Sequence, residues 1–153
     1  MKKIGAFTIK SPHRCDRLHS GVNLFVPGNP SKRMGKPLKA VWDTGATSSC
    51  ISQKAVRALG LQRVSYRKIY TVNSSAEVKT YYVGLELPNY FMTTVTASAL
   101  ASISDDVDVV IGMDVISRGD FSVTNVLGKT TFSFRIPSVR EVDYEQEPLM
   151  NGE

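Results

Sequence analysis

The sequence has little cysteine and no long hydrophobic run, and both shortages restrict what the protein can be. Cys15 and Cys50 are the two cysteines among 153 residues. They are too few for a disulfide scaffold, so we interpret both as ordinary thiols in a reducing, cytoplasmic location. The longest apolar stretches have the length of a strand, well short of the roughly 20 residues that a membrane-spanning helix needs. We therefore expect no membrane association.

The N-terminal region lacks two further signatures. In MKKIGAFTIK, Lys10 returns charge before an apolar region forms, so this start does not predict a signal peptide. His13, Cys15, Asp16 and His19 are metal-binding residue types, but they lack CxxC or HExxH spacing and lie in a loop that contains Pro and Arg. A surface loop is the preferred interpretation, and we predict no metal and no cofactor.

The charge is distributed unevenly along the chain. Residues 1–80 carry fifteen Lys or Arg against three acids, whereas residues 81–153 carry four against eleven. The two halves attract each other, which suits one fold or a complementary assembly. Nucleic-acid binding is the alternative interpretation of the basic half, but its charges are spread over several expected elements without a stacking-aromatic motif. We expect no nucleic-acid partner.

Short runs with period-two alternation and β-branched or aromatic residues recur along the chain, which predicts an all-β domain. The length suits one domain with a proper core. The expected strands are residues 4–9, 22–26, 38–42, 64–71, 78–87, 91–97, 107–111, 121–124 and 130–134. We divide the chain into an N-terminal strand and loop (1–20), a main domain (21–137) and an acidic tail (138–153) that we expect to be disordered.

Two short helices and two connecting segments complete the predicted structure. Ser52 is the expected N-cap of the first helix and Gly60 its stop. A weaker second helix is expected over residues 114–118, closed by Gly119. The segment PGNPSKRMGKP predicts a solvated loop, and FSVTNVLGKTTFSF predicts a hairpin that turns near residues 125–129.

One stretch, AVWDTGATSS, places Asp43 between an apolar run and a series of small residues. Asp followed by Thr or Ser and Gly is weak evidence alone, because ordinary residue usage produces it in roughly one chain in ten of this length. A second apolar run that ends in glycine, VVIG with Gly112, follows about 65 residues later. The combination is more specific than either part.

This paired pattern, together with VVIGMD, GDFSV and TTFSFRIP, resembles the retropepsin-like (retroviral-type) aspartic proteases, and in particular their stand-alone bacterial members. The resemblance covers about residues 20–137. It implies a closed β-barrel of the acid protease fold and a C2 homodimer with one catalytic Asp per subunit. Trp42 departs from the aliphatic residue that is usual before that Asp, and it either fills the core or narrows a pocket.

The chemistry explains these residue types independently of the resemblance. Amide hydrolysis needs a base for water and an acid for the leaving nitrogen, and two close carboxylates that share a proton supply both. Thr44 offers a hydroxyl that can lock the loop, Gly45 allows a turn, and Ala46 leaves room for substrate. We therefore expect Asp43 to be catalytic, with support from Thr44, Gly45, Ala46 and Gly112.

The sequence contains one DTG, so the second carboxylate must come from another chain. A two-fold axis that places Asp43 beside Asp43 of a second copy supplies it. Asp114 is the alternative partner within one chain, but we expect it to cap the second helix. Asp120 is interpreted as a turn residue.

The resemblance also implies a flap that covers the substrate. IYTVNSSAEVKTYYVGL has two strand-like arms around residues 73–76, and a plain surface hairpin would show the same pattern. The expected substrate-binding residues are Thr71, Val72, Asn73 and Ser74. The predicted function is an aspartic endopeptidase acting on peptide or protein substrates, and the alternative is a peptide- or partner-binding domain that does not cut.

Overall fold

The structure is a computed structural model that describes residues 5–104 and 106–147. The strands are β1 (Gly5–Lys10), β2 (Leu18–Val26), β3 (Asn29–Arg33), β4 (Leu38–Trp42), β5 (Cys50–Ser52), β6 (Arg63–Tyr70), β7 (Ser75–Leu87), β8 (Phe91–Leu100), β9 (Val109–Ile111), β10 (Asp120–Thr124) and β11 (Thr131–Ile136). The helices are α1 (Gln53–Leu59) and α2 (Met113–Ile116), with short 3-10 turns at Pro88–Tyr90 and Val126–Gly128. The all-β prediction is confirmed.

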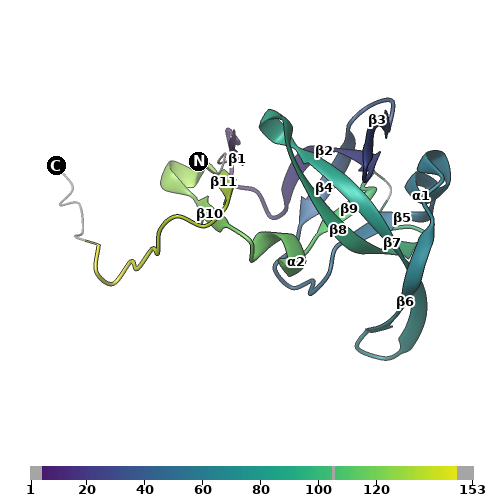
Figure 1. The fold of residues 1–153 in the computed structure, drawn as a ribbon. Coiled ribbons are helices and arrows are strands. Elements are labelled where there is room, and N and C mark those ends of the chain that lie inside the picture. Colours follow the sequence, from purple (N-terminus) through teal and green to yellow (C-terminus); the bar gives the residue numbers. More distant parts are fainter. Residues whose placement is uncertain (1–4, 105, 148–153) are drawn as a thin grey trace.

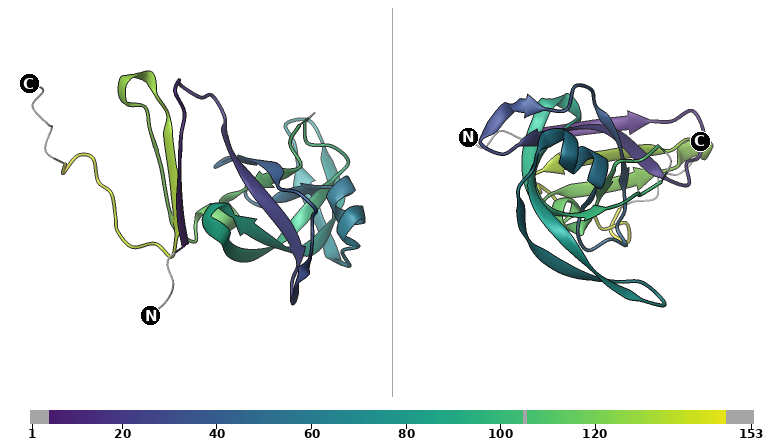
Figure 2. Two further views of the ribbon diagram at one scale, coloured as in Figure 1. Left: turned by 90° about the horizontal axis from the view of Figure 1, so that it is seen from above. Right: turned by 90° about the vertical axis from the view of Figure 1, so that its right-hand side faces the viewer.

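The strands form two sheets. The larger has the order β3-β2-β4-β9-β5-β8-β7-β6, with a further pairing of β2 and β7, and the smaller has the order β1-β11-β10. Figure 1 and the left view of Figure 2 show the small sheet standing to one side of the large one. All nine expected strands are present, β4 with the predicted ends and the others with shifted ends, and the predicted hairpin is β10 and β11.

Two strands were not predicted. The segment expected to be a solvated loop contains β3, which pairs with the end of β2. All five residues of β3 are exposed, so it has no apolar alternation to reveal it. The other strand, β5, has three residues and pairs with β8 and β9, which are distant in the sequence. Its existence depends on those partners and not on a local pattern.

Trp42 joins the two sheets through a cluster of aromatic rings. It is 5% exposed, and its ring centroid lies 4.8 Å from that of Phe134, 5.3 Å from Phe132 and 6.1 Å from Phe121. The indole Nε1 donates to Ser20 Oγ at 2.9 Å, which satisfies its buried polar group. Trp42 therefore fills the core next to Asp43, the residue that follows it in the chain.

The first helix matches its prediction. Ser52 Oγ accepts a hydrogen bond from the Ala55 N–H at 3.2 Å, and Gly60 ends the helix in the left-handed conformation with φ 61°. The second helix begins one residue earlier than expected and ends at Ile116. Gly119 does not stop it. A Cβ there would lie 1.8 Å from the Arg135 carbonyl oxygen, so glycine permits close approach to β11.

Asp120 is the first residue of β10 and not a turn residue, so that prediction is wrong. Its carboxylate accepts hydrogen bonds from Ser138 Oγ, from the Val139 N–H at 2.9 Å and from Arg135 Nε at 2.6 Å. These three partners, Ser138 first, hold the pKa of Asp120 well below its usual value. The segment after β11 is thereby attached to the small sheet, and residues 138–147 form no helix or strand.

Across residues 5–104 and 106–147, none of the helices has the length and apolar character that crossing a membrane requires.

Candidate active site

Asp43 follows the last residue of β4, in the middle of the large sheet. β4 runs parallel to β9, so that Ala40, Val41 and Trp42 lie opposite Val109, Val110 and Ile111. The Asp43 N–H donates to the Ile111 carbonyl at 2.9 Å and extends this pairing by one residue. The two apolar runs, whose paired residues are 69 positions apart in the sequence, therefore meet side by side.

Two hydrogen bonds between residues close in the sequence close the loop after β4. The Gly45 N–H donates to Asp43 Oδ1 at 2.8 Å, and the Ala46 N–H donates to the Asp43 carbonyl at 3.2 Å. A Cβ on Gly45 would lie 3.1 Å from Asp43 Oδ1, which is a tight contact. The carboxylate is oriented by its own loop, while Asp43 and Thr44 are both exposed.

Gly112 lies where the end of β9 passes the Asp43 loop. A Cβ at this position would be 2.7 Å from the Ala46 carbonyl oxygen and 2.8 Å from the Ser48 carbonyl carbon, both backbone atoms. The next residue, Met113, donates its N–H to the Ala46 carbonyl at 2.8 Å. The glycine allows the two backbones to approach, and the structure places Gly112, Gly45 and Ala46 around Asp43.

Ser49 and Asp114 brace the same loop, and the sequence did not reveal this pair. The Asp114 carboxylate accepts from the Ser49 N–H at 3.0 Å and from Ser49 Oγ at 2.7 Å. Ser49 is 1% exposed, and its Oγ accepts from the Gly112 N–H at 3.1 Å. The predicted capping role of Asp114 is wrong, because Gly112 is the N-cap of α2 and no side chain caps it. The carboxylate of Asp114 is engaged by Ser49.

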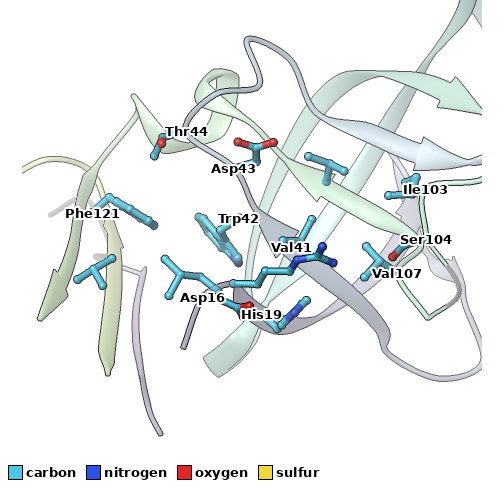
Figure 3. A pocket seen from close by; sticks show the side chains of 14 residues that line it. Asp16, His19, Val41, Trp42, Asp43, Thr44, Ile103, Ser104, Val107 and Phe121 are labelled. Atoms are coloured by element: carbon cyan, nitrogen blue, oxygen red, sulfur yellow. The ribbon is translucent and has the colours of Figure 1, made fainter. Parts of the chain in front are cut away.

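A cavity of about 560 Å³ opens beside Asp43. Its apolar lining includes Val41, Val110 and Phe121, and Thr44 also reaches it. Figure 3 shows Asp43 and Thr44 on one side of this space and His19 on the other. The cavity can hold a side chain of a bound molecule next to the carboxylate.

The expected flap is a hairpin of β6 and β7 that projects from the body (Figure 2, right). Its turn is formed by residues 71–74, two residues earlier than the expected centre. The Thr71 N–H donates to the Ser74 carbonyl at 2.8 Å, the Oγ atoms of the two residues are 2.7 Å apart, and Val72 is 99% exposed. Thr71, Val72, Asn73 and Ser74 are not among the residues that line the cavity.

The structure describes both thiols and all four candidate metal ligands, His13, Cys15, Asp16 and His19. Cys15 and Cys50 are both free. Burial raises the pKa of the Cys50 thiol, as does the negative charge of Asp114, while Arg67 acts in the opposite direction. Among the residues that the structure describes, no group of three His, Cys, Asp or Glu side chains is arranged to hold a metal ion.

Comparison of the fold with solved structures identifies aspartic proteases. A retropepsin-like aspartic protease from Rickettsia conorii superimposes with a TM-score of 0.55 at 15% identity, over 88% of this chain and 96% of that one. The EIAV protease complexed with the inhibitor HBY-793 gives a TM-score of 0.48 at 17% identity, over 67% and 86%. The simian foamy virus (mac) protease gives 0.44 at 20% identity, over 65% and 92%. The Rickettsia structure supports the retropepsin-like fold.

The sequence matches no curated protein, but it does match a family model. Residues 32–118, more than half of the chain, match the family model described as "gag-polyprotein putative aspartyl protease". This range contains the Asp43 loop, the β6 and β7 hairpin and Gly112. The chain belongs to the retropepsin-like aspartic protease family.

Proposed function

We propose that the protein is an aspartic endopeptidase whose catalytic site forms across a homodimer, with Asp43 of each copy as the catalytic residue. One observation carries the proposal. The parallel pair β4 and β9 presents the exposed Asp43 carboxylate, oriented by the Gly45 N–H, at the edge of a cavity that can hold a substrate side chain.

The need for two chains follows from the chemistry. Two carboxylates in hydrogen-bond reach share one proton, because like charges that close do not both ionise easily. The ionised carboxylate takes a proton from water, and the protonated one donates to the scissile amide. Within one chain, Asp114 is engaged by Ser49, which favours a second copy as the source of the other carboxylate. In this proposal Thr44, exposed beside Asp43, faces that copy.

The small sheet offers a surface for the second copy. β10 is an edge strand in the order β1-β11-β10, so one row of its backbone groups has no strand partner among the described residues. Phe121 and Val123 of β10 line the same cavity as Asp43. Val126 and Leu127, at the tip of the β10 and β11 hairpin, are 72% and 91% exposed. We propose that β10 pairs with β10 of the second copy about the two-fold axis.

The hairpin of β6 and β7 supplies the substrate cover in this proposal. Residues 71–74 would add backbone hydrogen bonds to an extended peptide, as a strand does at a sheet edge. Closure of such a hairpin excludes water from the reacting bond. The exposure of Val72 supports this role, because an apolar side chain at a free tip gains contacts when it closes over a ligand.

The function is tested by comparing the unmutated protein with Asp43→Asn on a broad peptide library between pH 4 and 7. We expect cleavage by the unmutated protein, inhibition by a statine-type compound and no cleavage by Asp43→Asn. Asp16→Asn is the matched control, because Asp16 lines the same cavity, and it should retain activity. Cleavage that survives in Asp43→Asn contradicts the assignment. If the unmutated dimer cleaves nothing, the binding function replaces the catalytic one.

The assembly is tested with single cysteines on the two edges of the small sheet. Ser122 lies at the centre of β10, so a two-fold axis through this centre would place it opposite Ser122 of the second copy. The closest directly opposed Cβ atoms of antiparallel strands are about 4.5 Å apart, which is the upper end of the range for a disulfide. We expect Ser122→Cys to cross-link two chains under oxidation. Thr8→Cys on β1, the opposite edge, is the control and should not. Cross-linking through position 8 alone would indicate an interface at β1 in place of β10. A single-chain mass in sedimentation would contradict the homodimer.

We also propose a cytoplasmic location, which the two free thiols support. Fractionation of cells that produce a tagged chain tests it, and recovery with the membrane or secreted fraction would contradict it.

A further inference from the structure

A row of polar side chains crosses four strands of the large sheet on the face opposite the apolar core, and its two central members, Ser98 and Thr80, are 1% and 2% exposed. Cys50 of β5 pairs with Ser98 of β8, Ser98 pairs with Thr80 of β7, and Thr80 pairs with Ser65 of β6. Directly paired residues point to the same face of a sheet. The next residues, such as Ile51, Ala97 and Tyr81, point to the core. We call Cys50, Ser98, Thr80, Ser65 and Arg67 the polar row.

Arg67 belongs to this row because it lies two residues after Ser65 on the same strand face. Its Nη1 donates to Ser98 Oγ at 3.4 Å, a long hydrogen bond for a guanidinium that has five N–H donors. Among the described lysines and arginines, Arg67 and Arg135 are the partly buried ones, and Arg135 pairs with Asp120. Arg67 has no carboxylate within ion-pair distance in the described part of the chain.

A second unused polar group lies in the same row. Thr80 is 2% exposed, and its Oγ1 has no hydrogen-bond partner among the residues that the structure describes. A buried hydroxyl without a partner is costly, so its retention calls for an explanation. The carboxylate of Asp114, which acts on Cys50 through its charge, is held by Ser49. Among residues 5–104 and 106–147, the polar row therefore contains hydrogen-bond donors and no carboxylate that accepts from them.

The position of the row relates it to the proposed site. β5 follows the Asp43 loop directly, and β6 is one arm of the proposed flap. In Figure 1 that loop and the hairpin of β6 and β7 both extend toward the lower edge of the view. Because β8 and β7 connect β5 to β6, the row spans the sheet between the loop and the hairpin. A peptide held under the hairpin would present side chains to this face.

We propose that the polar row is a recognition subsite that takes an Asp or Glu side chain of the bound peptide, with Arg67 as the residue that determines this specificity. The inference rests on the proposed function, since it concerns the substrate of that site. A carboxylate would receive charge-assisted hydrogen bonds from the Arg67 guanidinium, which is the partly exposed cation of the row. The two-fold axis repeats the subsite, so an acidic preference is expected on both sides of the scissile bond.

The first experiment profiles cleavage of a broad peptide library by the unmutated protein and then measures kcat/KM on matched peptides that carry Glu or Gln at the preferred position. We expect Asp and Glu to be enriched at one position on each side, with a Glu preference of about tenfold. Arg67→Met should bring the Glu to Gln ratio close to one. Lys68→Met is the matched control, because Lys68 is the exposed neighbour on the opposite face of the hairpin, and it should keep the preference.

A second measurement separates this inference from the proteolytic function. Fluorescence anisotropy of Asp43→Asn with the acidic peptides, and with versions that carry Asn and Gln instead, reports binding without cleavage. Tighter binding of acidic peptides that disappears in the double variant Asp43→Asn/Arg67→Met supports the subsite even if nothing is cleaved. Cleavage without acidic preference, or a preference that Arg67→Met leaves unchanged, overturns it.

Discussion

The Asp43 loop and the hairpin of β6 and β7 are held to the molecule in different ways. Buried residues hold the loop at both ends: Trp42 precedes it in the core, Gly112 passes against its backbone, and Ser49 is 1% exposed. The hairpin turn is closed by contacts between Thr71 and Ser74, and Val72 at its tip is 99% exposed. Fixed geometry is what a reacting carboxylate requires, whereas a cover for a peptide must be able to move.

The largest expected difference between the two regions is in stability. Trp42→Ala should lower the free energy of unfolding by about 3–5 kcal/mol, because it removes a buried ring packed against four others. Tyr70→Ala, at the outer end of β6, should change it by less than about 0.5 kcal/mol, since Tyr70 is 76% exposed. Urea unfolding at one protein concentration measures both. Equal losses would contradict the contrast between the regions.

A smaller effect is expected from one added methyl group in the Asp43 loop. Gly112→Ala places a Cβ 2.7 Å from the Ala46 carbonyl oxygen and should cost about 1–3 kcal/mol. Gly35→Ala is the control, because no atom lies within 4 Å of a Cβ there. Thermal unfolding should show a lower midpoint for Gly112→Ala alone. An unchanged midpoint would mean that the backbone of the loop moves to make room for the methyl group, which would contradict a rigid Asp43 loop.

The smallest expected effect on stability is at the hairpin tip. Val72→Ser should leave the free energy of unfolding within about 0.5 kcal/mol of the unmutated value, because the side chain is 99% exposed. It should nevertheless raise KM for a peptide substrate, since the apolar contact is made on closure. Steady-state kinetics on a cleaved library peptide checks this. An unchanged KM would favour the plain surface hairpin that the sequence could not exclude.

The sequence predicted correctly the elements whose signal lies within one short stretch of neighbouring residues. β4 follows from an apolar run, α1 from the Ser52 cap and Gly60 stop, and the hairpin of β6 and β7 from two alternating arms. What the sequence could not predict depends on long-range contacts. The bond between Ser49 and Asp114 joins residues 65 apart, and β5 exists through its pairing with β8 and β9.

The candidate site was predictable to a similar extent. The motif identified Asp43, Gly45, Ala46 and Gly112 in two segments, and the structure brings those segments together by pairing β4 with β9. The polar row was not predictable, since Cys50, Ser98, Thr80 and Arg67 become neighbours through sheet register alone. The homodimer, the closed barrel and the roles of residues 71–74 remain predictions.

The central claim, that one site needs Asp43 from two chains, is tested most directly by mixing. The unmutated protein and Asp43→Asn are combined at constant total concentration, left to exchange subunits, and assayed on one peptide. If each site needs both carboxylates, activity falls with the square of the unmutated fraction, to about one quarter in an equal mixture, as random pairing in a C2 dimer requires. A fall in direct proportion, to one half, would contradict the account, because each chain would then act alone.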